Sequence, residues 1–96
     1  MSELQVIARY TVSPGNQDRV LDLLSTLTVA SRAEPGTVSF TVNRQVDDEH
    51  SVVLLERYAS RDAFAAHRES AHFTELVLGQ IVPLLDSRVV ETFDVV

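Results

Sequence analysis

Residues 51–58 are apolar on both faces, and this pattern restricts the fold of the chain more than any other. One face carries Val52 and Leu54, and the other carries Val53 and Leu55. A strand of this kind lies at the centre of a sheet that is covered on both sides. A chain of 96 residues supplies only one core of useful size, because two cores would each be too small to be stable. The sequence therefore predicts a single domain, residues 1–96, with this strand near its middle.

Periodic patterns before and after this strand complete the expected fold. Alternating apolar residues predict strands, and apolar residues at helical spacing predict helices that lie on a sheet. Pro35 ends the first helix, because the residue before a proline avoids the helical region. Ser60 and Ser70 are cap residues that begin helical segments, and the polar residues 47–50 are expected to form a turn. The expected order is strand 4–12, helix 17–33, strand 37–44, strand 51–58, helical segments 60–79 and strand 88–95.

This β-α-β-β-α-β order predicts an α+β protein with the ferredoxin-like fold, in which helices cover one face of an antiparallel sheet. The other face carries Ile7, the set of Val53 and Leu55, and half of residues 89–93. This face is too apolar for open solvent. A second sheet has to cover it, and another copy of the chain is the simplest source. We therefore expect a homodimer whose two sheets pack face to face.

Composition excludes several classes of protein. The chain has no cysteine, which rules out disulfides, thiolate metal ligands and cysteine nucleophiles. A net charge of −6 disfavours nucleic acid and anionic membranes as partners. None of the three glycines falls in a phosphate-binding spacing, so no nucleotide or flavin cofactor is expected. All eight basic residues are arginine, as in proteins from GC-rich bacterial genomes. No membrane span or leader pattern is found, so we expect a cytoplasmic protein.

His67 is the first candidate for a catalytic residue. At helical spacing it shares a face with Ala63, Phe64 and Ala71, so it points toward the sheet. An imidazole away from water stays neutral, which suits a general base or a hydrogen-bond partner of a substrate hydroxyl. The alternative is a structural histidine bonded to a backbone carbonyl or to Tyr58, and the sequence leaves both readings open.

The other histidines are weaker candidates, and no metal site is expected. His50 lies in an acidic turn and is expected to be solvated, whereas His72 lies in the first turn of the next helical segment. His67 and His72 are five residues apart across a helix break, with no acid in sequence at a fitting position.

Charged residues in the central strands are expected to form structural ion pairs. Glu56, Arg57 and Arg9 lie in strands that should be buried on both faces, and a buried charge needs a partner. We expect the pairs to run across the sheet or across the dimer interface.

A small-molecule pocket is expected between the sheet and the helices. Such pockets have apolar walls and a few polar groups. Tyr10 and Tyr58 could also supply hydrogen bonds there. The candidate substrate-binding residues are Tyr10, Leu24, Phe40, Leu54, Tyr58, Phe64, Phe73 and Leu76.

Four short stretches resemble the antibiotic biosynthesis monooxygenase family. They are Pro14-Gly15, Glu34-Pro35-Gly36, Glu56-Arg57-Tyr58, and His67 through Phe73. The resemblance implies a dimeric α/β barrel with a pocket between sheet and helices. Members of the family include cofactor-independent oxygenases, quinol monooxygenases, haem-degrading enzymes and an isomerase of a sugar phosphate. The haem-degrading branch is disfavoured, because Ala8, His67 and Val77 stand where that branch has its Asn, Trp and iron-binding His.

The first functional hypothesis is a cofactor-independent monooxygenase that oxidises a small aromatic, quinol or polyketide-like substrate with O2. His67 would then accept or stabilise a proton in a pocket from which water is excluded. A second hypothesis is an isomerase or degradative enzyme for a small polar metabolite, which needs Arg9, Arg44 or Arg68 in the pocket. A third is a non-catalytic, ligand-binding or stress-related dimer in which His67 is structural.

Overall fold

The structure, a computed structural model, describes residues 2–96 and contains one four-stranded antiparallel sheet. The strands are β1 (Glu3–Val12), β2 (Thr37–Gln45), β3 (Asp48–Tyr58) and β4 (Leu85–Val95), in the spatial order β2-β3-β1-β4. β3 and β1 are the two central strands, as the apolar pattern of residues 51–58 predicts. All three strand pairs are antiparallel.

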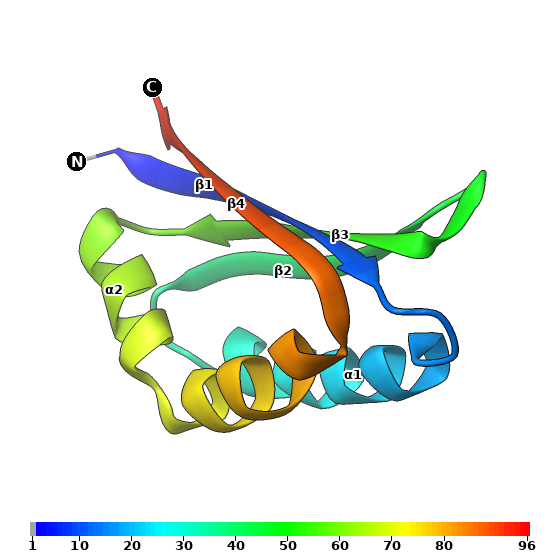
Figure 1. The fold of residues 1–96 in the computed structure, drawn as a ribbon. Helices are drawn as coiled ribbons and strands as arrows, with labels where there is room; N and C mark the ends of the chain where they lie inside the picture. Colours follow the sequence, from blue (N-terminus) through cyan, green and yellow to red (C-terminus); the bar gives the residue numbers. More distant parts are fainter. Residues whose placement is uncertain (1) are drawn as a thin grey trace.

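The helices lie on one face of this sheet (Figure 1). They are α1 (Gln17–Arg32), α2 (Arg61–Glu69), the π-helical segment η1 (Phe73–Ile81) and the short turn η2 (Val82–Leu84). The element order and the layer arrangement confirm the predicted ferredoxin-like α+β fold. None of the helices in residues 2–96 is both long enough and apolar enough to cross a membrane.

The core forms where the alternating face of β1 meets the helices. Five β1 residues on this face are at most 3% exposed: Leu4, Val6, Ala8, Tyr10 and Val12. Ala8, Tyr10 and Val12 pack with the inward residues Leu24 and Leu27 of α1 and with Phe40 of β2. Leu4 and Val6 form a second cluster with Tyr58, against which Ala63 and Phe64 of α2 pack. Burial of such side chains contributes roughly 1.5–3 kcal/mol each, so this layer fixes how the helices lie on the sheet.

The starts of β3 and β4 each differ by three residues from those expected. The turn between β2 and β3 comprises Val46 and Asp47 and not residues 47–50, so the expected position of the turn was wrong. Asp48 belongs to β3, where its carboxylate accepts hydrogen bonds from the backbone N–H of His50 and from Ser51 Oγ. These local bonds keep polar residues in the strand. β4 begins at Leu85, earlier than residue 88.

Ser60 and Ser70 both organise helix ends, though not in the same way. Ser60 Oγ accepts a hydrogen bond from Ala63 N at 3.1 Å, which confirms it as the N-cap of α2. Ser70 is the C-cap residue that follows this helix, and its Oγ donates to His67 O at 2.6 Å and accepts from Phe73 N at 3.2 Å. Ser70 therefore ends α2 and caps the next helical stretch, which begins at Ala71 and continues into η1. The helix restart predicted at Ser70 is confirmed.

The sheet face opposite the helices is exposed in a single chain and is partly apolar. Leu55, Val89 and Phe93 are 41%, 52% and 48% exposed there. The expected ion pairs of Arg57 and Arg9 are found on this face, with Glu3 at 3.1 Å and Glu91 at 3.2 Å. Both pairs are partly solvent-exposed, so each adds no more than about 1 kcal/mol.

Candidate functional site

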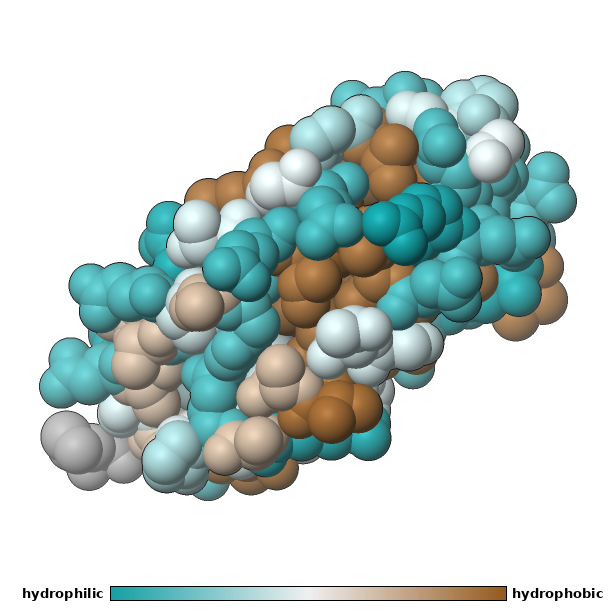
Figure 2. All heavy atoms as spheres, turned by 90° about the horizontal axis from the view of Figure 1, so that it is seen from below, coloured by the Kyte–Doolittle hydropathy of each residue, from teal (hydrophilic) through white to brown (hydrophobic). Residues whose placement is uncertain are grey.

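A cavity of about 610 Å³ lies between the sheet and the helices α2 and η1. The helices pack over β1, β2 and β3, while the helix-facing residues of β4 are exposed. Seen from the helix side, apolar residues gather near the middle of the surface between hydrophilic side chains (Figure 2). The wall includes Val6, Ala8, Tyr10, Leu27, Phe40, Leu54, Glu56, Phe64, His67, Arg68, Phe73, Val77, Arg88, Val90 and Thr92.

The structure brings five of the eight predicted substrate-binding residues to this cavity. Tyr10, Phe40, Leu54, Phe64 and Phe73 are part of its wall. The other three lie elsewhere, because each belongs to the packing behind the wall. Leu24 is fully buried in the main core, against which the half-buried Leu76 packs. Tyr58 is fully buried in the cluster with Leu4 and Val6.

His67 lies in the cavity wall and is surrounded by aromatic rings. It is only 2% exposed, and its ring centroid is 6.0 Å from Phe40, 5.3 Å from Tyr58 and 5.4 Å from Phe73. Burial lowers the pKa of His67 below its usual value, although the nearby carboxylate of Glu34 acts in the other direction. Burial outweighs the carboxylate, so the imidazole is neutral at pH 7.

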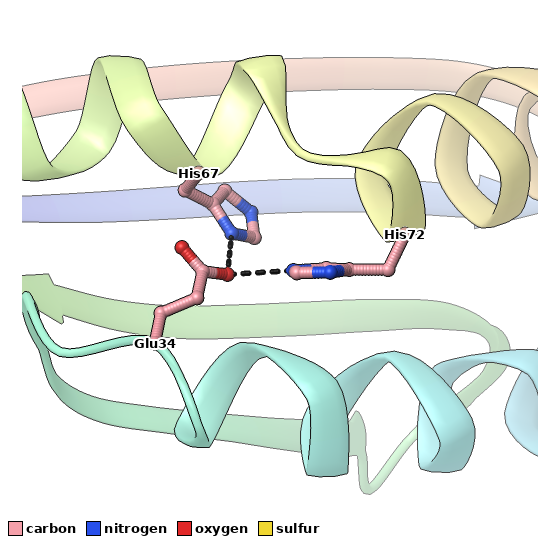
Figure 3. Close-up of side chains that lie close together, drawn as sticks. All are labelled: Glu34, His67 and His72. Atoms are coloured by element: carbon pink, nitrogen blue, oxygen red, sulfur yellow. Dashed lines mark hydrogen bonds and ion pairs between the residues drawn. The ribbon is translucent and has the colours of Figure 1, made fainter.

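Glu34 connects His67 to His72 through one carboxylate oxygen (Figure 3). Its Oε2 is 2.8 Å from His67 Nδ1 and 2.7 Å from His72 Nε2. An ionised carboxylate only accepts hydrogen bonds, so each imidazole donates an N–H to it. The three side chains come from the turn between α1 and β2, from α2, and from the segment between α2 and η1. This arrangement leaves Nε2 of His67 as the ring nitrogen with the lone pair.

The sequence reasoning missed Glu34. It found no acid near His67 and His72, and this was wrong, because Glu34 is 33 residues before His67 yet bonded to it. The only sequence signal was Glu34-Pro35-Gly36, which indicated a helix end. The turn that holds Glu34 is fixed by two backbone bonds, Glu34 N to Ser31 O and Thr37 N to Glu34 O, each 3.2 Å long.

Glu56 is a buried carboxyl group in the same cavity. It is 5% exposed, and it accepts a hydrogen bond from the Tyr58 hydroxyl at 2.5 Å. The expected ion pair for Glu56 is therefore replaced by a neutral hydroxyl donor. Burial raises the pKa of Glu56 to about 7, and the Tyr58 bond and Arg88 only partly oppose this. Burial and the neighbouring Glu56 also raise the pKa of Tyr58, which keeps its proton.

His67 and Glu56 face each other across a short gap. His67 Nε2 is 3.9 Å from Glu56 Oε1. A neutral imidazole beside a carboxyl group that titrates near pH 7 can both take and give a proton in the cavity.

Two arginines add positive charge to the wall. The Arg88 guanidinium lies 5.9 Å from the centre of the Phe73 ring, and that of Arg68 lies 5.7 Å from the centre of the Phe64 ring. Burial raises the pKa of Tyr10, and a hydrogen bond with Arg88 partly offsets the rise. Of the arginines considered for a polar substrate, Arg68 lines the cavity, whereas Arg9 pairs with Glu91 on the opposite face and Arg44 lies near the β2–β3 turn. Arg88 was not predicted.

The chain belongs to the antibiotic biosynthesis monooxygenase family, because residues 4–77 match the family model of that description. This confirms the resemblance found in the sequence. "Putative monooxygenase Rv0793" of Mycobacterium tuberculosis (strain ATCC 25618 / H37Rv) is 36% identical over 72 residues, 75% of this chain and 70% of the relative. "Putative monooxygenase YcnE" of Bacillus subtilis (strain 168) is 32% identical over 70 residues, 73% of this chain and 74% of the relative.

Solved structures share the fold over almost the full chain. The structure of Rv0793 has a TM-score of 0.91 at 31% identity and covers 99% of this chain and 96% of its own. A structure described as "Putative antibiotic biosynthesis monooxygenase from Nitrosomonas europaea" has a TM-score of 0.93 at 22% identity, with 99% and 91% covered. The second bears on the fold alone.

Proposed function

We propose that this protein is a cofactor-independent monooxygenase that oxidises a small aromatic or quinol-like substrate with O2, and that His67 accepts the substrate proton. The observation that carries the proposal is a neutral, buried imidazole in the wall of an aromatic cavity. A volume of about 610 Å³ is within the usual range for small-molecule sites. Membership of the family, with two relatives whose names read "Putative monooxygenase", supports the reaction class.

Different residues of the cavity carry out different steps of the proposed reaction. His67 Nε2 takes a proton from an acidic O–H or C–H group of the substrate, because Glu34 holds the other ring nitrogen as a donor. The resulting anion lies near Arg88 and gives one electron to O2, and the two radicals combine into a peroxide. The peroxide takes the proton back from His67. It then loses water, whose other hydrogen comes from the carbon that carries the peroxide, so that one oxygen atom remains in the product as a carbonyl. Aromatic walls orient the substrate and exclude bulk water.

The test is oxygen uptake by chelator-treated protein with a panel of quinols, naphthols and anthrones. We expect uptake above autoxidation, and a loss of about 100-fold or more in His67→Gln, because removal of a general base typically costs that much. Gln fills a similar space and keeps a donor for Glu34, so the fold should survive. His50→Gln is the matched control, since His50 lies in β3 outside the cavity wall. Equal uptake by His67→Gln and the natural chain would refute the role of His67.

A second candidate function has a specific observation in its favour. Arg68 and Arg88 in the cavity wall suit an anionic metabolite, as an isomerase or degradative enzyme would require. No uptake with any member of the panel, together with thermal stabilisation by small carboxylates or phosphate esters, would favour this alternative. Stabilisation by a ligand without any turnover would favour the non-catalytic, ligand-binding dimer.

We also propose that the protein is a homodimer of its single domain, working in the cytoplasm without nucleic-acid or membrane partners. Leu55, Val89 and Phe93 make the open face apolar, and a second sheet packed on it would give the α/β barrel expected from the sequence.

Leu55→Asp is expected to convert the dimer into a monomer, because it puts a charge in the middle of the proposed interface. Light scattering after gel filtration should then give a mass near the 10.7 kDa of one chain and not twice that value. Val46→Asp is the control, since Val46 is fully exposed at the β2–β3 turn. A natural chain that is already monomeric at high concentration would contradict the proposal.

A further inference from the structure

Glu34, His67 and His72 form a set of donors that suits a transition-metal ion. Each offers one ligand atom, and the three atoms lie within 4.8 Å of one another. Two imidazole nitrogens and a carboxylate oxygen are typical ligands of Zn²⁺, and a site with three protein ligands leaves a fourth position for water. Glu34 is the acidic ligand that the sequence around His67 and His72 lacks.

The donors converge on one point without a change of fold. Oε2 of Glu34 is 2.7 and 2.8 Å from the two nitrogens, and Figure 3 shows both rings directed at this oxygen. Ligands of a tetrahedral zinc ion are about 3.3 Å apart, given metal–ligand distances near 2.0–2.1 Å. Small side-chain rotations are therefore enough for one ion to take the place of the two protons that join the imidazoles to Glu34.

Accessibility differs across the cluster in a way that admits an ion from solvent. The side chains of His72 and Glu34 are 23% and 15% exposed, whereas that of His67 is 3% exposed. His67 also has an outer partner, because its Nε2 is 3.9 Å from Glu56 Oε1. Histidine ligands usually donate their second ring N–H to a carboxylate, and Glu56 is the carboxyl group on that side of His67 once a metal on Nδ1 leaves the ring proton on Nε2.

We propose that Glu34, His67 and His72 bind a divalent transition-metal ion such as Zn²⁺, and that the bound ion stops His67 from accepting the substrate proton. The metal takes the lone pair of Nδ1, so the remaining ring proton of neutral His67 is on Nε2. His67 then donates toward the cavity and no longer accepts. The binding site is independent of the proposed oxygenase activity, whereas the inhibitory effect rests on it.

Calorimetric titration of chelator-treated protein with ZnCl2 tests the site directly. We expect saturable binding of one ion per chain, with Co²⁺ giving the visible absorption of a tetrahedral complex. His72→Ala and Glu34→Gln should each weaken binding by about tenfold or more, because each removes a ligand. His50→Ala is the control: His50 is also a histidine beside a carboxylate, with Nε2 3.7 Å from Glu49, but it has no place in the cluster. Absence of saturable binding, or binding that His72→Ala leaves intact, overturns the site.

Oxygen uptake with and without Zn²⁺ tests the inhibitory effect. The natural chain should lose most of its uptake in step with metal occupancy, and the ratio of uptake with and without zinc should stay near one in His72→Ala. Full uptake by zinc-saturated protein, or uptake that requires zinc, overturns this effect. If no substrate supports uptake, the proposed oxygenase fails, while the calorimetric result still decides whether the metal site exists.

Discussion

Glu56→Gln is expected to be more stable than the natural chain at about pH 8 by roughly 3 kcal/mol, and to lose that advantage at about pH 4. Burial raises the pKa of Glu56 from an ordinary value of 4.5 to about 7. Between these values the folded chain binds a proton that the unfolded chain has released, so the stability from this group falls as pH rises from about 4.5 to about 7. Gln has no proton to lose, and its side-chain oxygen still accepts the Tyr58 hydroxyl bond.

Urea unfolding at several pH values, with chelator present, measures this effect. The useful quantity is the difference in unfolding free energy between Glu56→Gln and the natural chain at each pH, because other groups titrate in both. Glu75→Gln is the control, since Glu75 is exposed on η1. If the unfolding free energies of Glu56→Gln and the natural chain changed in parallel with pH, Glu56 would be ionised in the folded chain at a much lower pH than proposed.

The sequence predicted the scaffold well because the scaffold depends on local periodicity. Leu4, Val6 and Ala8 alternate with polar or half-buried residues, and this alternation alone indicates which face of β1 is buried. The predicted inward face of α2 likewise placed His67 in the interior. These inferences need only the residues of one segment.

The partners of His67 could not be predicted, because they come from segments distant in the chain. Glu34 belongs to a turn whose local pattern indicates only a helix end, and its approach to His67 depends on how this turn packs against α2. Glu56 is similar: a charge in a central strand suggested an ion pair, whereas the fold gave it the hydroxyl of Tyr58, two residues along the same face of β3. Arg88 was not predicted to line the cavity, because nothing in the sequence of β4 indicates that the helices leave the helix-facing side of this strand uncovered.

Gly36→Ala is expected to destabilise the fold by about 2 kcal/mol and to separate Glu34 from His67. A Cβ atom at Gly36 would lie 2.4 Å from Ala63 Cβ and 3.4 Å from Ala63 Cα. Carbon atoms pack best at about 3.5–4.0 Å, so the turn and α2 must move apart. Gly36 O also accepts a hydrogen bond from Ala59 N at 2.9 Å, which joins this turn to the start of α2. The loss of stability should lower Tm by about 10 °C.

Ala63→Gly provides the matched test of this contact. Alone it should cost up to about 1 kcal/mol, because Gly is a poor helix former. Combined with Gly36→Ala it removes the clashing methyl group, so the double variant should be more stable than the sum of the single effects by more than about 1 kcal/mol. Gly79→Ala is the control, since its Cβ would meet only Thr74 O at 3.4 Å. Strict additivity would show that close packing of the turn against α2 is not what holds Glu34 beside His67. Recovery of oxygen uptake or zinc binding in the double variant would show that this packing positions the carboxylate.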